Sequence, residues 1–428
     1  MFKKCVVGML VIGLIFSLGI ASFAEKTKLL VYERLDGCLE DTTEKLEIAF
    51  EEEFPDIDIT IETFVPKTYQ NEILLLAASG KLDADVIYSV SDFRLNVFVN
   101  GGIIIPLDEL LEKSGIDISK YPQRLFQAGT RNGKLYGFPQ RPQPRGTVNY
   151  NQDLFDELGI PYITRETTWE EFKGYLRKLT LKDEDGTVIR YGCLDKYPQL
   201  DLLYLFGGRM VDDPFNPTEV VFGEDLVKVF GEFLEMAEEG LMMPLPVYKA
   251  LGGSKPKIFA EEKVATIITH LGYRGGFATA SFRWDAELIP APNGVFGGAH
   301  TDLMGWSINA KSKNPEVAFK WIKWSTFSPI AQNIYDSQWE VNSNKMSYVT
   351  ELNETFAEIA DQRQPAGWRC VYEAQKNVVV FPIFEGSGDF MNKYWEATWG
   401  VLYDGNSLET LLEAEKEMQR LLDEALAK

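Results

Sequence analysis

The chain has 428 residues, of which 45% are hydrophobic and 25% charged, with 64 acidic against 43 basic side chains. A formal net charge of −21 argues against nucleic acid as a partner and is typical of a well-solvated surface. A chain of this length exceeds what one hydrophobic core usually organises, so we expect two domains or lobes.

The N-terminus has the pattern of a secretory signal peptide. Two lysines precede an apolar stretch over residues 6–20, and Ser22 and Ala24 offer small residues for cleavage. A retained membrane anchor is the alternative, but the stretch falls short of the roughly 20 apolar residues that a spanning helix needs. We therefore expect residues 1–24 to be removed and the mature protein to act in the periplasm or outside the cell.

Three cysteines lie beyond the expected signal peptide, namely Cys38, Cys193 and Cys370. An odd number, widely spaced in a long chain, argues against a disulfide scaffold. One bridge stays open as an alternative, but free buried thiols are the favoured interpretation.

The first part of the mature chain alternates predicted strands with predicted helices. In chain order these are a strand over 29–32, a helix starting near Asp41 and ending before Pro55, a strand over 57–62, a helix over 69–79 and a strand over 85–88. Asp41 with Glu44 three residues later has the pattern of a helix cap. This order is typical of an α/β sheet.

Turn and cap signals continue along the rest of the chain. We expect hairpin turns at Asn132-Gly133 and Asp185-Gly186 and a capping box at Thr168 with Glu171. The proline-rich residues 139–144 should be extended and are the first candidate for a crossover between lobes. Further predicted elements are strands over 147–151 and 188–192 and helices near 224–239, 315–327 and 408–427, with Asn314 capping the second of these helices.

The order of these segments resembles the extracellular solute-binding proteins of carbohydrate ABC importers, the family 1 group that includes maltose-binding protein. The resemblance is carried by residues 54–57 (FPDI), 77–80 with 84–88, 133–139 (GKLYGFP) with 150–155, 168–172 (TWEEF), 259–265 (FAEEKVA), and 305–310 (GWSINA) with 314–318. Each motif alone is a common turn or cap. Their order along nearly the whole mature chain makes the resemblance specific.

The resemblance implies an α/β fold of the type II periplasmic-binding-protein kind, with two lobes and a ligand cleft between them. The N-terminal lobe would take residues 25–140 plus 303–340, and the C-terminal lobe 141–302 plus 341–428. Closure of the lobes about a hinge would trap a sugar, polyol or cyclitol for delivery to the permease subunits of an ABC importer. We expect a monomer with no cofactor and no metal. The Pro-Trp pair that is common in the family's ligand loop is replaced by Leu271-Gly272-Tyr273, so a tyrosine would take the stacking role.

Carbohydrate binding needs aromatic plates for the C–H face of a sugar and polar groups for its hydroxyls. Aromatic residues make up 13% of the chain. Ligands of open α/β sheets bind beyond the carboxyl ends of strands, so residues there and at the crossovers are the best candidates. The candidates are Tyr32, Glu33, Arg34, Asp36, Ser89, Asp92, Arg145, Tyr273, Arg274, Trp306, Trp339 and Trp368. For each of them the alternative role is structural, because tryptophans mostly pack in cores and charged residues mostly face solvent.

Two alternatives to a binding protein for a neutral sugar stay open. Two arginines near the cleft could bind a carboxylate in a paired fork, which would favour a uronic acid or another acidic ligand. A secreted carbohydrate hydrolase is the alternative to a binding protein, because a glycosidase needs only two suitably spaced carboxylates. The sequence has only two histidines and neither a zinc-hydrolase motif nor a nucleophile elbow, so we expect no enzyme activity.

Overall fold

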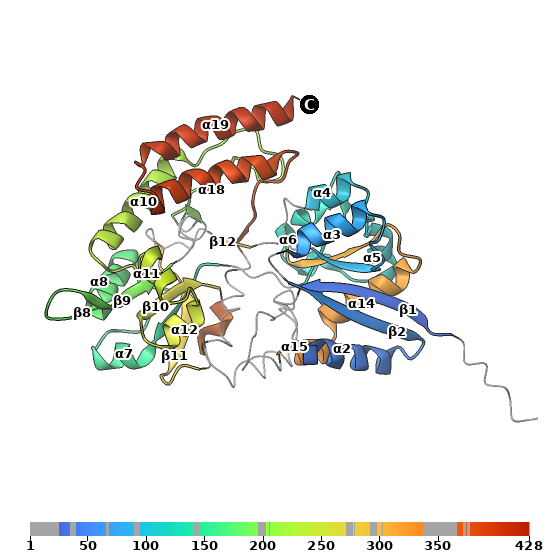
Figure 1. Cartoon of the computed structure of the whole chain (residues 1–428), viewed down its shortest axis with the longest axis horizontal. Helices are drawn as coiled ribbons and strands as arrows, with labels where there is room; N and C mark the ends of the chain where they lie inside the picture. Colours follow the sequence, from blue (N-terminus) through green and yellow to red (C-terminus); the bar gives the residue numbers. More distant parts are fainter. Residues whose placement is uncertain are drawn as a thin grey trace, which may run out of the picture.

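The structure is a computed structural model. It describes residues 25–34, 40–65, 68–89, 95–140, 145–195, 203–204, 206–270, 277, 279–291, 298–301, 303–336, 366–370, 374 and 377–427. Two five-stranded sheets form the centres of two α/β halves, which lie side by side in Figure 1. Strand β12 lies between the halves.

The first sheet has the strand order β2-β1-β3-β13-β6. Its strands are β1 (Thr27–Arg34), β2 (Ile57–Phe64), β3 (Val86–Ser89), β6 (Phe138–Pro139) and β13 (Gly305–Ile308). Strand β1 pairs in parallel with β2 and β3, whereas β13 runs antiparallel to β3 and β6. Strand β2 alternates buried and exposed side chains, as predicted for a half-buried strand.

Helices cover both faces of the first sheet (Figure 1). They are α2 (Glu40–Glu53), α3 (Tyr69–Ala78), α4 (Leu95–Asn100), α5 (Asp108–Ser114), the 3-10 turn η2 (Ile118–Lys120), α6 (Gln123–Ala128), α14 (Pro315–Phe327) and α15 (Pro329–Asp336). A small hairpin of β4 (Thr130–Arg131) and β5 (Lys134–Leu135) leads into β6. Helices α2, α14 and α15 pack together, so the segment that returns at residue 303 completes this lobe.

The second sheet has the order β11-β7-β10-β9-β8. Its strands are β7 (Thr147–Asn151), β8 (Leu181–Lys182), β9 (Val188–Leu194), β10 (Val264–Thr269) and β11 (Trp284–Leu288). Its helices are α7 (Gln152–Glu157), α8 (Trp169–Leu179), α10 (Gly223–Glu238), α11 (Leu245–Ala250), α12 (Lys255–Ala260), α18 (Ser387–Tyr403) and α19 (Glu409–Leu426). Strands β9 and β10 are parallel, and β7 is antiparallel to β10 and β11.

The two halves have separate hydrophobic cores. One core takes residues mainly from 29–138 and 303–335, and the others take residues from 148–299, 370–374 and 381–422. Val378, Val380 and Ile383 pack with the first core and Phe381 with the second, so this short segment touches both lobes. The predicted lobe boundaries stay a prediction, since the one at residue 340 lies outside the described residues.

Short strands join the halves. Strand β12 (Ala299–His300) pairs in parallel with β14 (Val378–Val379), and the 3-10 turn η5 (Ala366–Arg369) packs on β11. Because β12 and β14 belong to segments that run between the lobes, their pairing is where a hinge would act.

Most local predictions agree with the structure. The Thr168 side chain accepts from the main-chain N–H of Glu171, and the Glu171 side chain accepts in return, which confirms the capping box. Asn132 and Gly133 have φ of 51° and 74°, as a tight hairpin turn requires. The Asp41 cap is wrong, because α2 already begins at Glu40. Asn314 occupies the N-cap of α14, but its side chain makes no capping hydrogen bond.

Two of the cysteines beyond the expected signal peptide lie among the described residues. Cys193 and Cys370 are free and buried, as expected, whereas Cys38 lies outside the described residues. Burial raises the pKa of the Cys193 thiol to about 12, so this thiol stays protonated and unreactive near neutral pH. No helix in the described part of the chain is long and apolar enough to cross a membrane.

Candidate ligand-binding site

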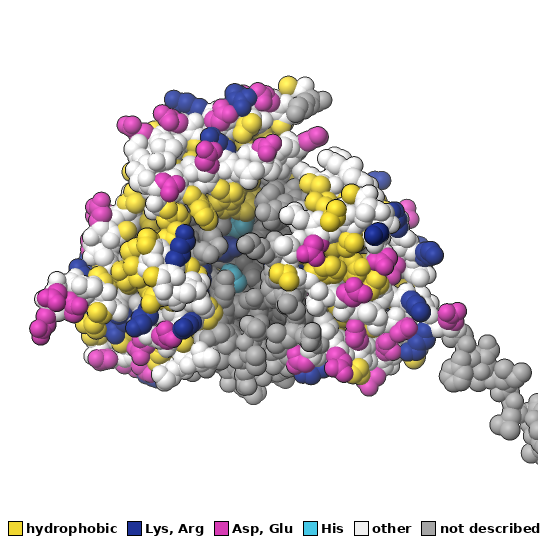
Figure 2. Space-filling view, in the orientation of Figure 1, with side chains coloured by type: hydrophobic (Ala, Val, Ile, Leu, Met, Phe, Trp, Pro, Cys, Tyr) yellow, Lys and Arg dark blue, Asp and Glu magenta, His cyan; other side chains and the backbone are white. Residues whose placement is uncertain are grey.

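In each sheet, a set of strand ends faces the crossover between the lobes. In the first sheet β1, β3 and β6 run in the same direction, so Arg34, Ser89 and Pro139 end at one edge. The chain then enters the second sheet through β7, whose first residue, Thr147, pairs with the last residue of β10, Thr269. Ligands of open α/β sheets bind beyond such strand ends. Figure 2 shows a hollow between the halves that contains histidine and basic side chains.

At the second sheet, polar side chains gather where the strands end. The Thr147 hydroxyl donates to the Thr269 carbonyl over 2.8 Å, and the Lys255 ammonium group donates to the Thr269 hydroxyl over 3.2 Å. The Arg145 main-chain N–H donates to the His300 carbonyl over 2.9 Å. We call Arg145, Lys255, Thr269, His270 and His300 the recognition edge. These residues lie in or next to β7, α12, β10 and β12.

His300 is the clearest candidate for a ligand contact on this edge. Its side chain is 1% exposed, and neither ring nitrogen has a hydrogen-bond partner within the described residues. The imidazole lies against Phe381 with 4.0 Å between ring centroids. A buried polar group without a hydrogen bond costs free energy, and a bound hydroxyl that donates and accepts would satisfy such an imidazole.

Both histidines of the recognition edge are neutral at physiological pH. Burial lowers the pKa of His270 well below its usual value, and the charges of Arg145 and Lys255 lower it further. Burial and the charge of Arg145 have the same effect on the pKa of His300. A neutral imidazole offers one donor and one acceptor, which matches the hydrogen-bonding capacity of a hydroxyl group.

The predicted first-lobe residues Tyr32 and Ser89 form hydrogen bonds within that lobe. The Tyr32 hydroxyl donates to Asp83 over 2.6 Å, and its ring lies 4.7 Å from that of Phe64. The Ser89 hydroxyl is 2.6 Å from that of Ser307, and both residues are buried. These contacts give Tyr32 and Ser89 structural roles in this conformation.

Glu33 and Arg34 end β1 at the edge that faces the crossover. Glu33 is fully buried and Arg34 is half-buried. Adjacent residues of a strand point to opposite faces, so the two side chains diverge from each other. The Tyr69 hydroxyl accepts from the main-chain N–H of Tyr88 in β3 over 2.8 Å. The charges of Glu33 and Arg34 both affect the pKa of this buried hydroxyl, so both residues lie near β3.

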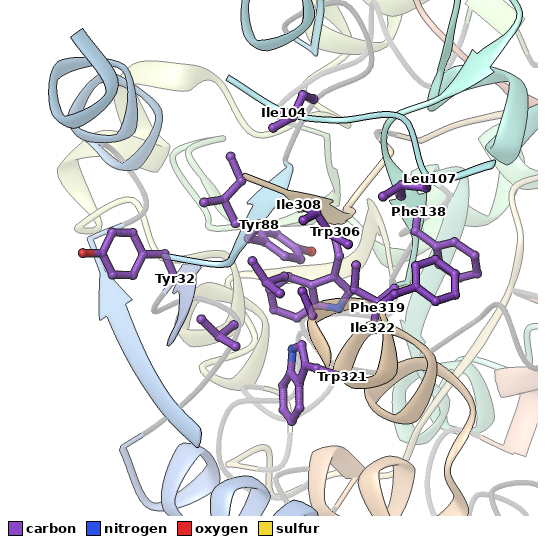
Figure 3. Packing of buried hydrophobic residues seen from close by; sticks show 14 of the residues in the cluster. Tyr32, Tyr88, Ile104, Leu107, Phe138, Trp306, Ile308, Phe319, Trp321 and Ile322 are labelled. Atoms are coloured by element: carbon purple, nitrogen blue, oxygen red, sulfur yellow. The ribbon is translucent and has the colours of Figure 1, made fainter. Parts of the chain in front are cut away.

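Trp306 lies inside the first core. It is fully buried, with its ring 5.0 Å from that of Tyr88 and 6.3 Å from that of Trp321. Figure 3 shows it among Ile308, Phe319 and Ile322, below the sheet. In this conformation the predicted aromatic plate is therefore a core residue, and an enclosed ring has no surface for a sugar to stack on.

Among the predicted residues, Arg145 is the one from the second lobe whose side chain is described. It is half-buried and lies on the recognition edge. Asp36, Asp92, Tyr273, Arg274 and Trp339, and the side chain of Trp368, lie outside the described residues.

Four polar residues of this region were not among the candidates predicted from the sequence, namely His270, His300, Lys255 and Asp195. Asp195 follows β9 directly and is 4% exposed, and its charge and that of Lys255 both act on the Cys193 thiol. Asp195 and His270 each come directly after an observed strand, β9 and β10. The strand predicted from the sequence ended at residue 192 and none was predicted over 264–269, so the strand-end rule did not reach either residue. Lys255 opens a helix, and His300 lies in a two-residue strand, so no sequence signal marked them.

The described part of the candidate site offers hydrogen-bonding groups beside an aromatic ring. No group of three or more His, Cys, Asp or Glu side chains that could hold a metal ion occurs among the described residues. Hydrogen-bond donors and acceptors beside an aromatic ring suit a neutral or anionic polar ligand.

The chain matches the model of the bacterial extracellular solute-binding protein family over residues 38–330. Since the match covers more than half of the chain, the protein belongs to this family. It is therefore a binding protein by family and fold, which agrees with the resemblance seen in the sequence.

Solved structures with the same fold cover almost the whole chain. An ABC substrate-binding protein from Listeria monocytogenes, in complex with cycloalternan, has a TM-score of 0.75 at 19% identity and covers 93% of this chain and 99% of its own. The sugar-binding protein MalE from Xanthomonas citri has a TM-score of 0.74 at 17% identity, with 93% and 98% covered. A sugar transporter from Rhizobium etli in an open conformation has a TM-score of 0.73 at 18% identity, with 92% and 99% covered. These likenesses establish the two-lobed type II fold.

Proposed function

We propose that the protein is the extracytoplasmic substrate-binding component of an ABC importer and that it captures a sugar or a sugar-like polyol or cyclitol between its lobes. The observation that carries the proposal is the recognition edge, where the buried, neutral His300 lies beside Phe381 on the segments that join the lobes. An aromatic ring beside groups that can donate and accept suits a polyol, which has apolar C–H faces and many hydroxyls.

Membership of the family and the names of the similar structures support this choice. The protein from Listeria monocytogenes was solved in complex with cycloalternan, and the one from Xanthomonas citri is a sugar-binding protein. A maltose/maltodextrin-binding domain from Bdellovibrio bacteriovorus, bound to maltotriose, has the same fold. Nothing in the described site favours the hydrolase alternative over a binding protein.

Capture would proceed by closure of the lobes. The end of the first sheet that carries Arg34, Ser89 and Pro139 would approach the recognition edge, and β12 and β14 would serve as the hinge. Closing removes the ligand from water and so strengthens its hydrogen bonds. The closed form is what the permease subunits would receive. We further propose that the signal peptide is cleaved and that the mature protein acts as a monomer outside the cytoplasm.

A ligand screen tests the proposal. Mature protein is screened by thermal shift against sugars, oligosaccharides, cyclitols and sugar acids. A ligand that binds only the folded state at 100 times its Kd stabilises that state by about 2.7 kcal/mol. For each hit, small-angle scattering with and without ligand measures closure as a fall in the radius of gyration.

The same hits separate a binding protein from a hydrolase. We expect a bound oligosaccharide to be recovered intact after long incubation, as judged by chromatography. Turnover would favour the hydrolase, and binding without a fall in the radius of gyration would contradict capture by lobe closure.

A further inference from the structure

A pocket opens on the second lobe next to the recognition edge. Its volume is about 570 Å³, which lies within the roughly 300–1,000 Å³ that small-molecule sites occupy. The walls come from helices α10, α11 and α18 and from the chain that follows β9. Figure 2 shows hydrophobic side chains gathered on the second half beside the hollow between the halves. We call this space the apolar pocket.

Asp195 connects the apolar pocket to the recognition edge. It follows β9 directly and lines the pocket. Its charge and that of Lys255 both affect the pKa of the Cys193 thiol, so the two side chains lie near the same end of the sheet. Met243 also lines the pocket, and its main-chain N–H donates to the Cys193 carbonyl over 2.9 Å. Because β9 lies beside β10, the pocket begins next to the end of β10.

Half-buried hydrophobic side chains from three helices form most of the pocket's walls. They are Phe233, Leu234 and Ala237 of α10, Leu245 of α11, and Leu402 and Tyr403 of α18. All of them except Tyr403 pack on the two hydrophobic cores of the second lobe, so the pocket lies along the seam between these cores.

Walls of this kind favour an apolar group over a further sugar ring. A sugar ring carries hydroxyls around its edge, and each needs a hydrogen-bond partner when it leaves water. Hydrophobic side chains supply no such partners, but covering an aryl or alkyl group with them is favourable. Two of the charged lining residues, Lys249 and Asp404, are exposed to solvent. Apolar surface with a polar rim is typical of a binding groove.

We propose that the ligand is a glycoside whose sugar or polyol part lies at the recognition edge and whose aryl or alkyl group enters the apolar pocket. This inference rests on the proposed function, because it extends the same site. The occupant is part of the ligand, and not a second copy of the chain or a partner protein. Continuity of the pocket with the recognition edge through Asp195 favours this occupant.

Matched glycosides test the inference. Binding calorimetry on the mature protein compares methyl, propyl, hexyl and phenyl glycosides of glucose, galactose and mannose, and of any sugar that the ligand screen finds. In at least one series the affinity should rise by about four-fold for each methylene group that the pocket buries. The hexyl glycoside should then bind about ten-fold or more tighter than the methyl glycoside. Hexanol, which has no sugar part, should bind far more weakly than the hexyl glycoside.

Two variants test the pocket. Ala237→Phe places a ring on one wall, and Leu402→Gln makes another wall polar. Each should remove most of the gain from the hexyl group while the affinity for the methyl glycoside stays within about two-fold. Ala250→Phe is the matched control, because Ala250 is an exposed residue of α11 that does not line the pocket. It should leave both affinities unchanged. Melting temperatures establish that the variants fold, and either pocket variant alone is sufficient if the other does not.

The outcomes separate the inference from the proposed function. If alkyl and phenyl groups add no affinity to a methyl glycoside that binds, the inference falls and the proposed function stands. If the gain survives both pocket variants, or hexanol binds as tightly as the hexyl glycoside, the assignment of the apolar pocket is wrong. A dimer in light scattering that Ala237→Phe dissociates would show that a second copy covers the pocket, and the inference would fall. If the protein binds no carbohydrate in any form, the proposed function falls and the inference falls with it.

Discussion

The two lobes have the same architecture but use their strand ends differently. In the first lobe, Ser89 bonds to Ser307 and Tyr32 bonds to Asp83, so these strand ends complete the lobe's own packing. In the second lobe, the strand ends carry His270 and Asp195, with Lys255 beside them. Under the proposed function, side chains at strand ends would have structural roles in the first lobe and recognition roles in the second.

This difference predicts different roles for the two lobes. A lobe whose strand ends are internally bonded would act as a rigid surface, and the lobe with one buried lysine and two buried imidazoles would supply the polar groups that a ligand contacts. We therefore expect substitutions in the first lobe to change stability with little effect on affinity. Substitutions on the recognition edge should change affinity and pH dependence more than they reduce stability.

The largest expected effect is on the stability of the first lobe. Trp306→Ala removes a fully buried indole that packs against Tyr88 and Trp321. Large-to-small changes of this kind cost about 3–5 kcal/mol of unfolding free energy. Urea denaturation followed by circular dichroism measures the loss. Trp399→Ala, at a side chain that is 44% exposed, is the matched control and should cost far less. Equal losses would contradict the core role of Trp306.

The next effect is a dependence of stability on pH that comes from the recognition edge. The pKa values of His270 and His300 in the folded protein lie below the value of about 6.5 in the unfolded chain. The unfolded state therefore binds more protons below that pH. The stabilising contribution is fully present above pH 6.5 and is lost as the pH falls toward the folded pKa values. Each histidine should remove about 1.4 kcal/mol per pH unit in that window.

Unfolding free energies between pH 7.5 and 5.5 measure this slope. Replacing one histidine should remove that residue's contribution to the slope, and replacing both should nearly abolish the slope. A slope that stays unchanged in the double variant would show that other groups cause it.

His300→Leu should separate stability from recognition in a single change. Leucine fills a similar volume and removes two buried ring nitrogens that have no hydrogen-bond partner among the described residues. Since such groups cost about 1–3 kcal/mol when buried, we expect the ligand-free protein to gain about 1 kcal/mol of unfolding free energy. We also expect it to lose affinity for the ligand about ten-fold or more.

The control for this variant is His300→Asn, which keeps one donor and one acceptor. It should retain part of the affinity and gain no stability. If His300→Leu instead destabilises the protein and leaves binding intact, the imidazole is a structural group.

Much of the fold could be predicted from the sequence because its signals are local. The alternation of residues 57–62, the capping box at Thr168 and the turn at Asn132-Gly133 depend on residues a few positions apart. The Asp41 cap was wrong because a cap's position depends on where the preceding chain enters the helix, and a capping pattern does not fix that point.

The site was harder to predict because its parts come from distant segments. Arg145, His270 and His300 meet only after β7, β10 and β12 are assembled, and no spacing between them encodes that meeting. The strand-end rule also proposed Tyr32 and Ser89, since the sequence does not reveal which strand ends find partners inside their own lobe. Its position at a crossover favoured Trp306 as a sugar platform, although the side chain is fully buried.

The smallest expected effect tests the first lobe's side of the comparison. Ser89→Ala removes one partner of the 2.6 Å contact with Ser307, whose hydroxyl keeps its bond to the Tyr136 carbonyl over 2.8 Å. Because no buried group loses all its partners, the loss of unfolding free energy should be about 1 kcal/mol. Ligand affinity should stay within about two-fold, since a shift of 0.4 kcal/mol or less is what an indirect change usually produces.

A double-mutant cycle with Ser307→Ala isolates the contact, and its coupling energy should account for most of the loss. Calorimetry on Ser89→Ala then decides between the two roles of this strand end. A loss of affinity much larger than the loss of stability would mean that Ser89 leaves Ser307 and reaches the ligand when the lobes close. In that case both lobes would contribute recognition chemistry, and the asymmetry between them would hold only for the ligand-free conformation.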